Sequence, residues 1–329
     1  AGGAETGRGL VLGLLRLDGT DPASLMTGTG HALAPPGPEE TGRPLAEAPR
    51  AVRLDIPDWL LPRFDRSLGA EADRACEAQR HRAPVTLRVN LARTTRDAAR
   101  ALLAGEGIAT EPHPEVPTAL RVQGRAAGIA ASRAHAQGLV ELQDASSQAA
   151  VLRLPLADGD RVLDLCAGGG GKTLAMGARA RLRLFAHDAE PRRMADLAPR
   201  AARAGLAVAA LADPAARAPY DLVLIDAPCS GSGTWRRTPD AKWRLTPERL
   251  AALVALQDRL LDRAAALVAP RGHLAFATCS VLREEGRDRV AALLARRPGW
   301  EETDRFAALP DAWGDGFWQA VLRRGGHSP

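Results

Sequence analysis

Cysteine, lysine and aromatic side chains are scarce in this chain of 329 residues. Its four cysteines (Cys76, Cys166, Cys229 and Cys279) are scattered and fit neither a disulfide framework nor a paired zinc-ligand motif. We therefore expect a reduced, cytoplasmic protein without a metal site. The apolar run from residue 10 to 15 is too short to span a bilayer, so no membrane or secretory segment is expected.

Lysine is the rarest basic residue, since only Lys172 and Lys242 occur among 44 basic side chains. A lysine ammonium is a compact point donor, whereas an arginine guanidinium is a planar fork, so the two are not interchangeable at a tight site. Both lysines fall inside suspected chemical motifs. The net charge of +5 favours a polyanionic partner.

The first 140 residues suggest two segments. Residues 1–50 are rich in glycine, proline and alanine, and we expect them to be poorly structured apart from a short helix near residues 9–17. Residues 57–78 have helical periodicity. Strands are expected over 85–90 and 119–122 and a helix over 95–104, which together indicate a small, arginine-rich α+β module within residues 51–140.

From residue 141 to 329 apolar strands alternate with alanine- and arginine-rich helices, a pattern typical of βαβ units and a doubly wound sheet. The expected strands cover residues 161–166, 182–188, 207–212, 221–226, 272–278 and 317–323. The expected helices cover residues 173–179, 191–203, 247–268 and 284–296.

A glycine-rich turn follows the first of these strands and opens a helix, which suits close approach of a ligand to the backbone. A phosphate-binding loop of the Walker A type needs glycine at position 166, where this chain has Cys166, and a dinucleotide fingerprint fits only loosely. The expected cofactor contacts are Cys166, Ala167, Gly168, Gly169, Gly170, Gly171 and Lys172.

Aspartates end the next two strands. Asp188 is placed to bind a ribose hydroxyl, and Asp213 is placed to accept from an adenine amino group. No separate phosphate-recognition feature is visible. An adenosyl ligand without phosphates, namely S-adenosyl-L-methionine, is therefore the expected cofactor.

Two cysteines each follow a strand directly. Cys229 lies in Asp226-Ala-Pro-Cys, and Cys279 lies in Ala-Thr-Cys-Ser after the next strand. The carboxyl ends of adjacent parallel strands share one edge of a sheet, so both thiols should face one crevice. Paired thiols suit a reaction that makes and then breaks a covalent bond to its substrate.

The segment from Trp235 to Arg244 follows the Cys229 loop and carries Arg236, Arg237 and Lys242 between two tryptophans. Cations hold phosphates and indole rings stack on bases, so we expect RNA contact here; the alternative is a solvated charge run.

With these motifs, residues 55–329 resemble the RNA cytosine-C5 methyltransferase family, and within it the bacterial branch of small-subunit ribosomal RNA methyltransferase B. The motifs are Gln143-Asp144 with Ser147-Gln148, Leu163 to Thr173, Asp226 to Gly231, Thr278-Cys279-Ser280, Asp315 to Trp318, and Leu87 to Asn90. The family usually has alanine-proline where this chain has Gly168-Gly169. Ribosomal RNA members often carry an additional helical N-terminal domain, and only about fifty residues precede the match.

The resemblance implies a Rossmann-like class I methyltransferase sheet over residues 141–329 and an RNA-binding module over 51–140 that includes Arg88 and Asn90. It implies that Cys279 adds to carbon 6 of cytosine and that Cys229 helps to remove the carbon-5 proton. Asp226 would bind the base edge as well as border the cofactor site, and Lys172 would tune a thiol or orient the base. DNA cytosine methyltransferases use the proline-cysteine thiol as nucleophile, which is the opposite assignment.

The expected partner is RNA, with 16S ribosomal RNA as the first choice and transfer RNA as the alternative, and a monomer without membrane association is expected. A non-catalytic RNA-binding assembly factor is the competing class, although binding alone requires neither thiol. An NAD-dependent dehydrogenase would give no role to Cys229.

Overall fold

The structure is a computed structural model that describes residues 6–42, 44–124 and 126–325. Four parts of the chain lie outside the described residues: residues 1–5 and 43 of the expected N-terminal segment, residue 125 of the small module, and residues 326–329. The chain divides into two compact units, residues 1–61 and 62–329.

The first unit contains the short helices α1 (Gly7–Leu17), α2 (Pro22–Leu25) and α3 (Arg50–Arg53), with a 3₁₀ turn at Leu45–Glu47. Thr6 caps α1, because its hydroxyl accepts from the Gly9 amide at 3.1 Å. Arg8 ties this helix to the following loop through Glu40, at 2.6 Å. The expected helix near residues 9–17 is therefore present.

The second unit begins with two helices and a small sheet. The helical pattern of residues 57–78 is interrupted: α4 (Leu61–Leu68) and α5 (Ala72–Ala78) are separated by a 3₁₀ turn at Gly69–Glu71, where Gly69 has φ +57°. An antiparallel sheet follows in the order β2-β3-β1-β4. Its strands and helices are β1 (Thr86–Val89), β2 (Thr110–Pro112), β3 (Ala119–Val122), β4 (Val140–Leu142), α6 (Arg96–Gly105) and α7 (Arg133–Ala136).

A seven-stranded sheet forms the rest of the second unit, in the order β10-β11-β9-β8-β5-β6-β7. Strands β5 to β9 are parallel to one another, whereas β11 and β10 are antiparallel additions. The bounds are β5 (Arg161–Asp164), β6 (Arg183–Ala186), β7 (Val208–Ala210), β8 (Tyr220–Asp226), β9 (Val268–Thr278), β10 (Trp300–Ala308) and β11 (Phe317–Arg324). Strand order reverses between β5 and β8, the point where such sheets bind ligands.

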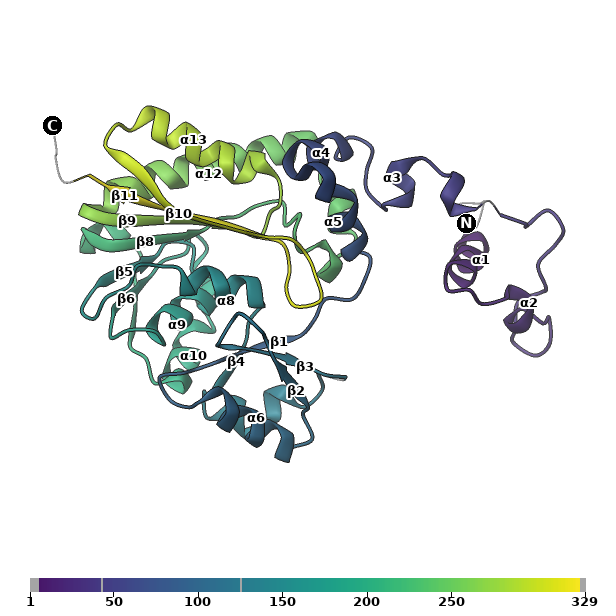
Figure 1. The fold of residues 1–329 in the computed structure, drawn as a ribbon, viewed down its shortest axis with the longest axis horizontal. Coiled ribbons are helices and arrows are strands. Elements are labelled where there is room, and N and C mark those ends of the chain that lie inside the picture. The colour runs from purple at the N-terminus through teal and green to yellow at the C-terminus, as the bar shows by residue number, and fades with distance from the viewer. Residues whose placement is uncertain (1–5, 43, 125, 326–329) are drawn as a thin grey trace. The chain divides into compact units, whose positions relative to one another are not determined.

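Helices cover both faces of this sheet, as Figure 1 shows, with α12 and α13 on one face and α8, α9 and α10 on the other. Successive strand residues face opposite ways, so Val223 packs in the core with Leu261 of α12, while Leu222 packs with Val151 of α8. The helix bounds are α8 (Ala145–Leu152), α9 (Gly171–Gly177), α10 (Leu197–Ala204), α11 (Ala241–Arg244), α12 (Pro247–Leu267) and α13 (Arg287–Arg296).

The expected Rossmann-like α/β fold is confirmed, with two additions. The sequence pattern did not predict β10, where half-buried and exposed side chains alternate along an edge strand. It also did not predict α8. Asp144 caps the N-terminus of this helix, because its side chain accepts from the Ser146 amide at 3.0 Å.

Candidate active site

A cavity of about 410 Å³ opens at the carboxyl ends of the strands beside the β5/β8 switch. It is lined by Asp144, Ser147, Lys172, Arg193, Asp226, Ala227, Pro228, Cys229, Thr234, Arg237, Cys279, Asp315 and Phe317. The expected catalytic residues Lys172, Asp226, Cys229 and Cys279 thus line one space. They come from the start of α9, the end of β8 and the turns after β8 and β9.

The sulfur atoms of Cys229 and Cys279 lie 3.4 Å apart. The hydrogen bond between the thiols lowers the pKa of Cys279, and the nearby Lys172 ammonium acts in the same direction. The same hydrogen bond, together with burial, raises the pKa of Cys229 well above its ordinary value. Of the two thiols, Cys279 is therefore the one that ionises more readily.

Lys172 and Asp226 form an ion pair of 2.6 Å that faces this cavity. Burial alone would lower the pKa of Lys172, but the carboxylates of Asp226 and Asp164 outweigh it, so the pKa is raised and the lysine stays charged. Asp164, at the end of β5, accepts from the Thr173 hydroxyl at 2.7 Å. Its burial raises its pKa to about 6.

A fully buried glutamate holds the Cys229 loop. Glu285 accepts from the Ser230 amide at 2.8 Å, from the Ser230 hydroxyl, and from the Gln257 side chain at 3.1 Å. Gln257 also donates to the Pro228 carbonyl at 2.9 Å. Because Glu285 follows the Cys279 turn, this network fixes the two thiol-bearing turns relative to each other.

Gln79, which is buried just after α5, also holds this loop. Its amide donates to the Ser232 carbonyl at 2.8 Å and accepts from the Trp235 amide at 2.9 Å. The sequence reasoning missed Gln79, Gln257 and Glu285, and no local motif distinguishes them.

A partly buried ionic network lines the cavity. Asp315 accepts from Arg236 at 2.6 Å and also from Arg237, which bridges to Asp144 at 3.1 Å. Burial, and then the Asp315 carboxylate, raise the pKa of Asp144. Arg236 is 8% exposed, so this side chain, expected to contact RNA, instead binds within the protein, whereas Arg237 lines the cavity.

The glycine turn is fixed by an aspartate at the end of β6. Asp188 accepts from the Gly168 amide at 3.0 Å and pairs with Arg193 at 3.2 Å. Gly170 has φ +81°, a conformation that favours glycine, and a Cβ there would lie 2.3 Å from the end of the Leu197 side chain. Burial raises the pKa of Cys166 to about 12, which leaves its thiol neutral.

Asp213 stands apart from these groups. It is exposed, and it caps the turn Pro214–Arg217 by accepting from the Ala215 amide at 2.9 Å. Its role toward an adenine stays a prediction.

Three other side chains expected at the RNA interface are buried. Arg88 donates to the Gly171 carbonyl at 2.8 Å, and Asn90 donates to the carbonyls of Gly138 and Ala204 at 3.3 Å. Lys242 is 4% exposed. Packing therefore assigns Arg88 and Asn90 to joining the small sheet to the large domain, a role that the sequence did not reveal.

The two tryptophans of the basic segment also differ. Trp235 is buried and stacks on Phe64 with ring centroids 5.7 Å apart, while Trp243 is 56% exposed. Of the two rings, Trp243 is thus the one available to a partner.

Within the described ranges, no group of three or more His, Cys, Asp or Glu side chains is placed to hold a metal ion. Nor does any helix in that part of the chain have the length and apolar character needed to cross a membrane.

Comparison with protein families gives two matches. Residues 151–319 match the model of the 16S rRNA methyltransferase RsmB/F. Residues 56–129 match the ferredoxin-like domain of RsmF/B-like methyltransferases. The two matches cover the large sheet and most of the small module.

Comparison with individual proteins leads to the same family. The chain is 35% identical over 288 residues to the ribosomal RNA small subunit methyltransferase B of Salmonella typhi, covering 82% of this chain and 67% of that protein. The crystal structure of PH0851 superposes with a TM-score of 0.78 at 28% identity, over 88% of this chain and 69% of the other. NSun6 from Pyrococcus horikoshii with SFG shares the fold, with a TM-score of 0.71 at 16% identity, over 83% and 99% of the two chains.

Proposed function

Because the chain belongs to the 16S rRNA methyltransferase RsmB/F family, and is therefore an RNA methyltransferase, we propose that it methylates carbon 5 of a cytosine in RNA through a covalent adduct with Cys279. The observation that carries this proposal is the 3.4 Å separation of two thiols that line one cavity with Lys172 and Asp226. A binding protein without catalysis would need neither thiol.

S-adenosyl-L-methionine is the cofactor, and it supplies a methyl group made electrophilic by a sulfonium. The residues beside the cavity suit this molecule. Asp188 offers a carboxylate next to the glycine turn for ribose hydroxyls, and no atom of the other described residues lies closer than 3.5 Å to the position of a Cβ at Gly168, which leaves room against the backbone. We expect Asp226 to border both the cofactor and the base.

Cys279 begins the reaction, since its lowered pKa favours the thiolate, which is the nucleophilic form. Its addition to carbon 6 of cytosine makes carbon 5 enamine-like and able to accept the methyl group. Asp226, held by Lys172, accepts from the base amino group, which orients the ring over the sulfur. The target base has to leave its stack to enter this pocket.

Cys229 acts in the second half of the reaction. The Cys279 sulfur raises the pKa of Cys229 in two ways, through the hydrogen bond between the thiols and through the negative charge of its own thiolate. A thioether carries no charge, so adduct formation lowers the pKa of Cys229 and allows its thiolate to form. That thiolate removes the carbon-5 proton, and the resulting electron pair expels Cys279.

Ribosomal RNA is the proposed substrate, because the matched family and the Salmonella relative are named for it. Transfer RNA is the alternative. Bisulfite sequencing of RNA from a deletion strain would distinguish the two, because loss of a single protected cytosine identifies the modified molecule.

Two substitutions test the roles of the thiols. With cofactor and RNA present, Cys279→Ala should neither methylate RNA nor crosslink to it, whereas Cys229→Ala should accumulate a covalent RNA complex visible on a denaturing gel. Cys76→Ala is the matched control, because Cys76 is buried in α5 outside the residues that line the cavity. Crosslinking by Cys279→Ala would reverse the assignment.

A further inference from the structure

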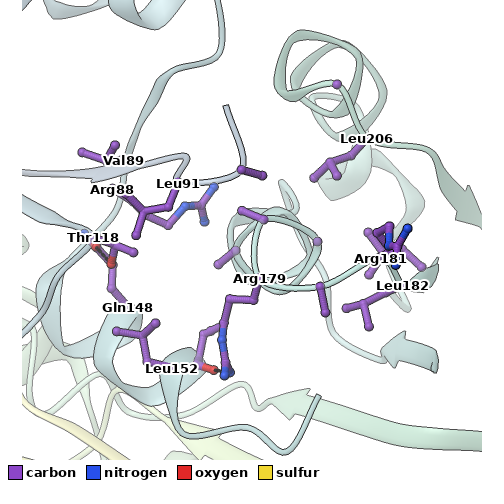
Figure 2. Close-up of a pocket in the computed structure, with 18 of the residues that line it drawn as sticks. Arg88, Val89, Leu91, Thr118, Gln148, Leu152, Arg179, Arg181, Leu182 and Leu206 are labelled. Atoms are coloured by element: carbon purple, nitrogen blue, oxygen red, sulfur yellow. Dashed lines mark hydrogen bonds between the residues drawn. The ribbon is translucent and has the colours of Figure 1, made fainter. Parts of the chain in front are cut away.

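A second cavity has a volume of about 720 Å³, and Figure 2 shows the residues that line it. Helices α8 and α9 separate the two spaces. Ser147 and Lys172 line the active-site cavity, whereas Gln148 and Ala175, on the same helices, line this one. The remaining walls come from the end of β1, from β6 and from the segment after α10.

The walls of this cavity are mainly aliphatic, and no aromatic ring is among the residues that line it. Its apolar side chains include Leu91, Val151, Leu152, Leu182, Leu184 and Leu206. Leu91 is 45% exposed at the rim. Aliphatic walls without rings suit a flexible hydrocarbon chain better than a nucleobase, for which proteins usually supply an aromatic surface to stack on.

Arg88 contributes a buried positive charge to the wall of this cavity. It is 4% exposed, and none of the carboxylates in the described residues lies within ion-pair distance of it. One terminal nitrogen donates to Gln143 and Gly171, but the buried Nε has no hydrogen-bond partner in the described structure. Burial lowers the pKa of Arg88 to about 10, and the Glu141 carboxylate opposes this shift only in part.

The rim is also basic. Arg179 donates to the carbonyls of Val151 and Leu154, and Arg181 pairs with Asp158 at 2.7 Å. Of the side chains that line the cavity, three are cationic and Asp158 alone is anionic. The space therefore combines apolar walls with an excess of positive charge.

We propose that this cavity binds an amphipathic anion, an aliphatic chain that ends in a carboxylate, with the head group at Arg88 and the chain along the leucine walls. The head group would reach the guanidinium of Arg88 from the cavity and add negative charge beside it. The chain would remove the leucine side chains from water. Because Arg88 also donates to the Gly171 carbonyl at the start of α9, the ligand would touch a side chain that supports the neighbouring active site.

Calorimetric titration of the full chain with decanoate tests this proposal, with decan-1-ol and acetate as comparison ligands. We expect saturable binding of one decanoate, at least tenfold tighter than either comparison ligand. The alcohol keeps the chain but lacks the charge, and acetate keeps the charge but lacks the chain. Equal binding of decanoate and decan-1-ol, or no saturation below the micelle-forming concentration, would overturn the proposal.

Two substitutions locate the site. Leu91→Glu puts a negative charge at the rim and should weaken decanoate binding at least tenfold. Leu142→Glu is the matched control, because Leu142 is 50% exposed and lies outside the residues that line the cavity, and it should leave the affinity unchanged. Arg88→Met should weaken decanoate but not decan-1-ol, and circular dichroism confirms that each variant is folded.

Equal affinities of Leu91→Glu and Leu142→Glu for decanoate would contradict the assignment. A different occupant would also overturn it. If an RNA oligonucleotide displaces decanoate, and Leu91→Glu weakens the RNA more than the decanoate, then the cavity is part of the RNA interface instead.

Discussion

The Nζ atom of Lys172 donates to Oδ2 of Asp226 over 2.6 Å and joins the first turn of α9 to the end of β8. The lysine side chain is 11% exposed, and its ammonium lies 5.0 Å from the centre of the Phe317 ring. Water screens this ammonium only weakly, so its charge acts strongly on neighbouring groups. Cys279 is one of those groups.

Replacement of Lys172 by methionine should raise the pKa of Cys279. The ammonium lowers that pKa, and the Asp226 carboxylate, which raises it, would be left unopposed. We expect the alkylation of Cys279 by iodoacetamide, followed by mass spectrometry, to need a higher pH, and methylation at pH 7 to fall at least tenfold. Lys242→Met is the control for the alkylation profile. If the pH dependence of Cys279 alkylation were the same in Lys172→Met as in the unmodified protein, the lysine would not influence the pKa of this thiol.

The convergence of the thiols could be predicted because it follows from strand topology. Asp226 and Ala277 are register partners in adjacent parallel strands, so the segments that continue from β8 and β9 leave the sheet together. The apolar runs before the Cys229 and Cys279 motifs are therefore sufficient to infer that the two thiols lie close together.

Side-chain partners could not be inferred in the same way. Gln79 is 153 residues from Ser232, and only folding brings the two into contact. Likewise, the sequence shows that Arg88 and Lys242 are cationic but not that they are buried, because burial depends on tertiary packing. For Arg88 that packing is the contact of the small sheet with the start of α9. Composition therefore overestimated the number of exposed cations available to RNA.

Glu285→Ala should destabilise the protein and reduce activity. The substitution leaves the Ser230 amide and the Gln257 side chain without an acceptor in the core, a cost of about 2–4 kcal/mol in the free energy of unfolding. Urea unfolding measures this value.

The neighbouring Glu284 gives a matched control for that change. It pairs with Arg63 and Arg66 on a partly exposed surface, so Glu284→Ala should cost less than about 1 kcal/mol. Equal losses for the two alanine variants would argue against a special role of Glu285 in holding the Cys229 loop.

Gly170→Ala should impair both stability and cofactor binding. The residue has φ +81°, and the added Cβ would lie 2.3 Å from Leu197. The left-handed backbone alone costs roughly 1–2 kcal/mol for a residue with a Cβ, and the contact with Leu197 adds to it.

Gly159→Ala separates those two contributions. Gly159 has φ +92°, and no atom lies within 4 Å of the position that a Cβ would take there, so its alanine variant reports the backbone cost alone. We expect Gly170→Ala to unfold at a lower urea concentration than Gly159→Ala, and calorimetry to show weaker S-adenosyl-L-methionine binding for Gly170→Ala only. Identical midpoints would mean that Leu197 moves aside freely.

Asp164→Asn should stabilise the protein above pH 6. Burial raises the pKa of Asp164 from an ordinary value of 3.8 to about 6, so the folded state holds a proton that the unfolded state releases earlier. Stability from this group is therefore complete below about pH 4 and is lost as the pH rises to 6, by about 3 kcal/mol in total. Asparagine is neutral at every pH and keeps an oxygen for the Thr173 hydroxyl. The gain of the variant should thus be near zero at pH 4 and greatest above pH 6 in urea unfolding.

Asp158→Asn should behave in the opposite way. Hydrogen bonds from Arg181 lower the pKa of Asp158, so its contribution to stability is present above its ordinary pKa and is lost as the pH falls. Removal of this carboxylate should therefore slightly destabilise the protein at neutral pH and have no effect at low pH. If Asp164→Asn instead lost stability at neutral pH, the Asp164 carboxylate would have to be stabilised in its charged form.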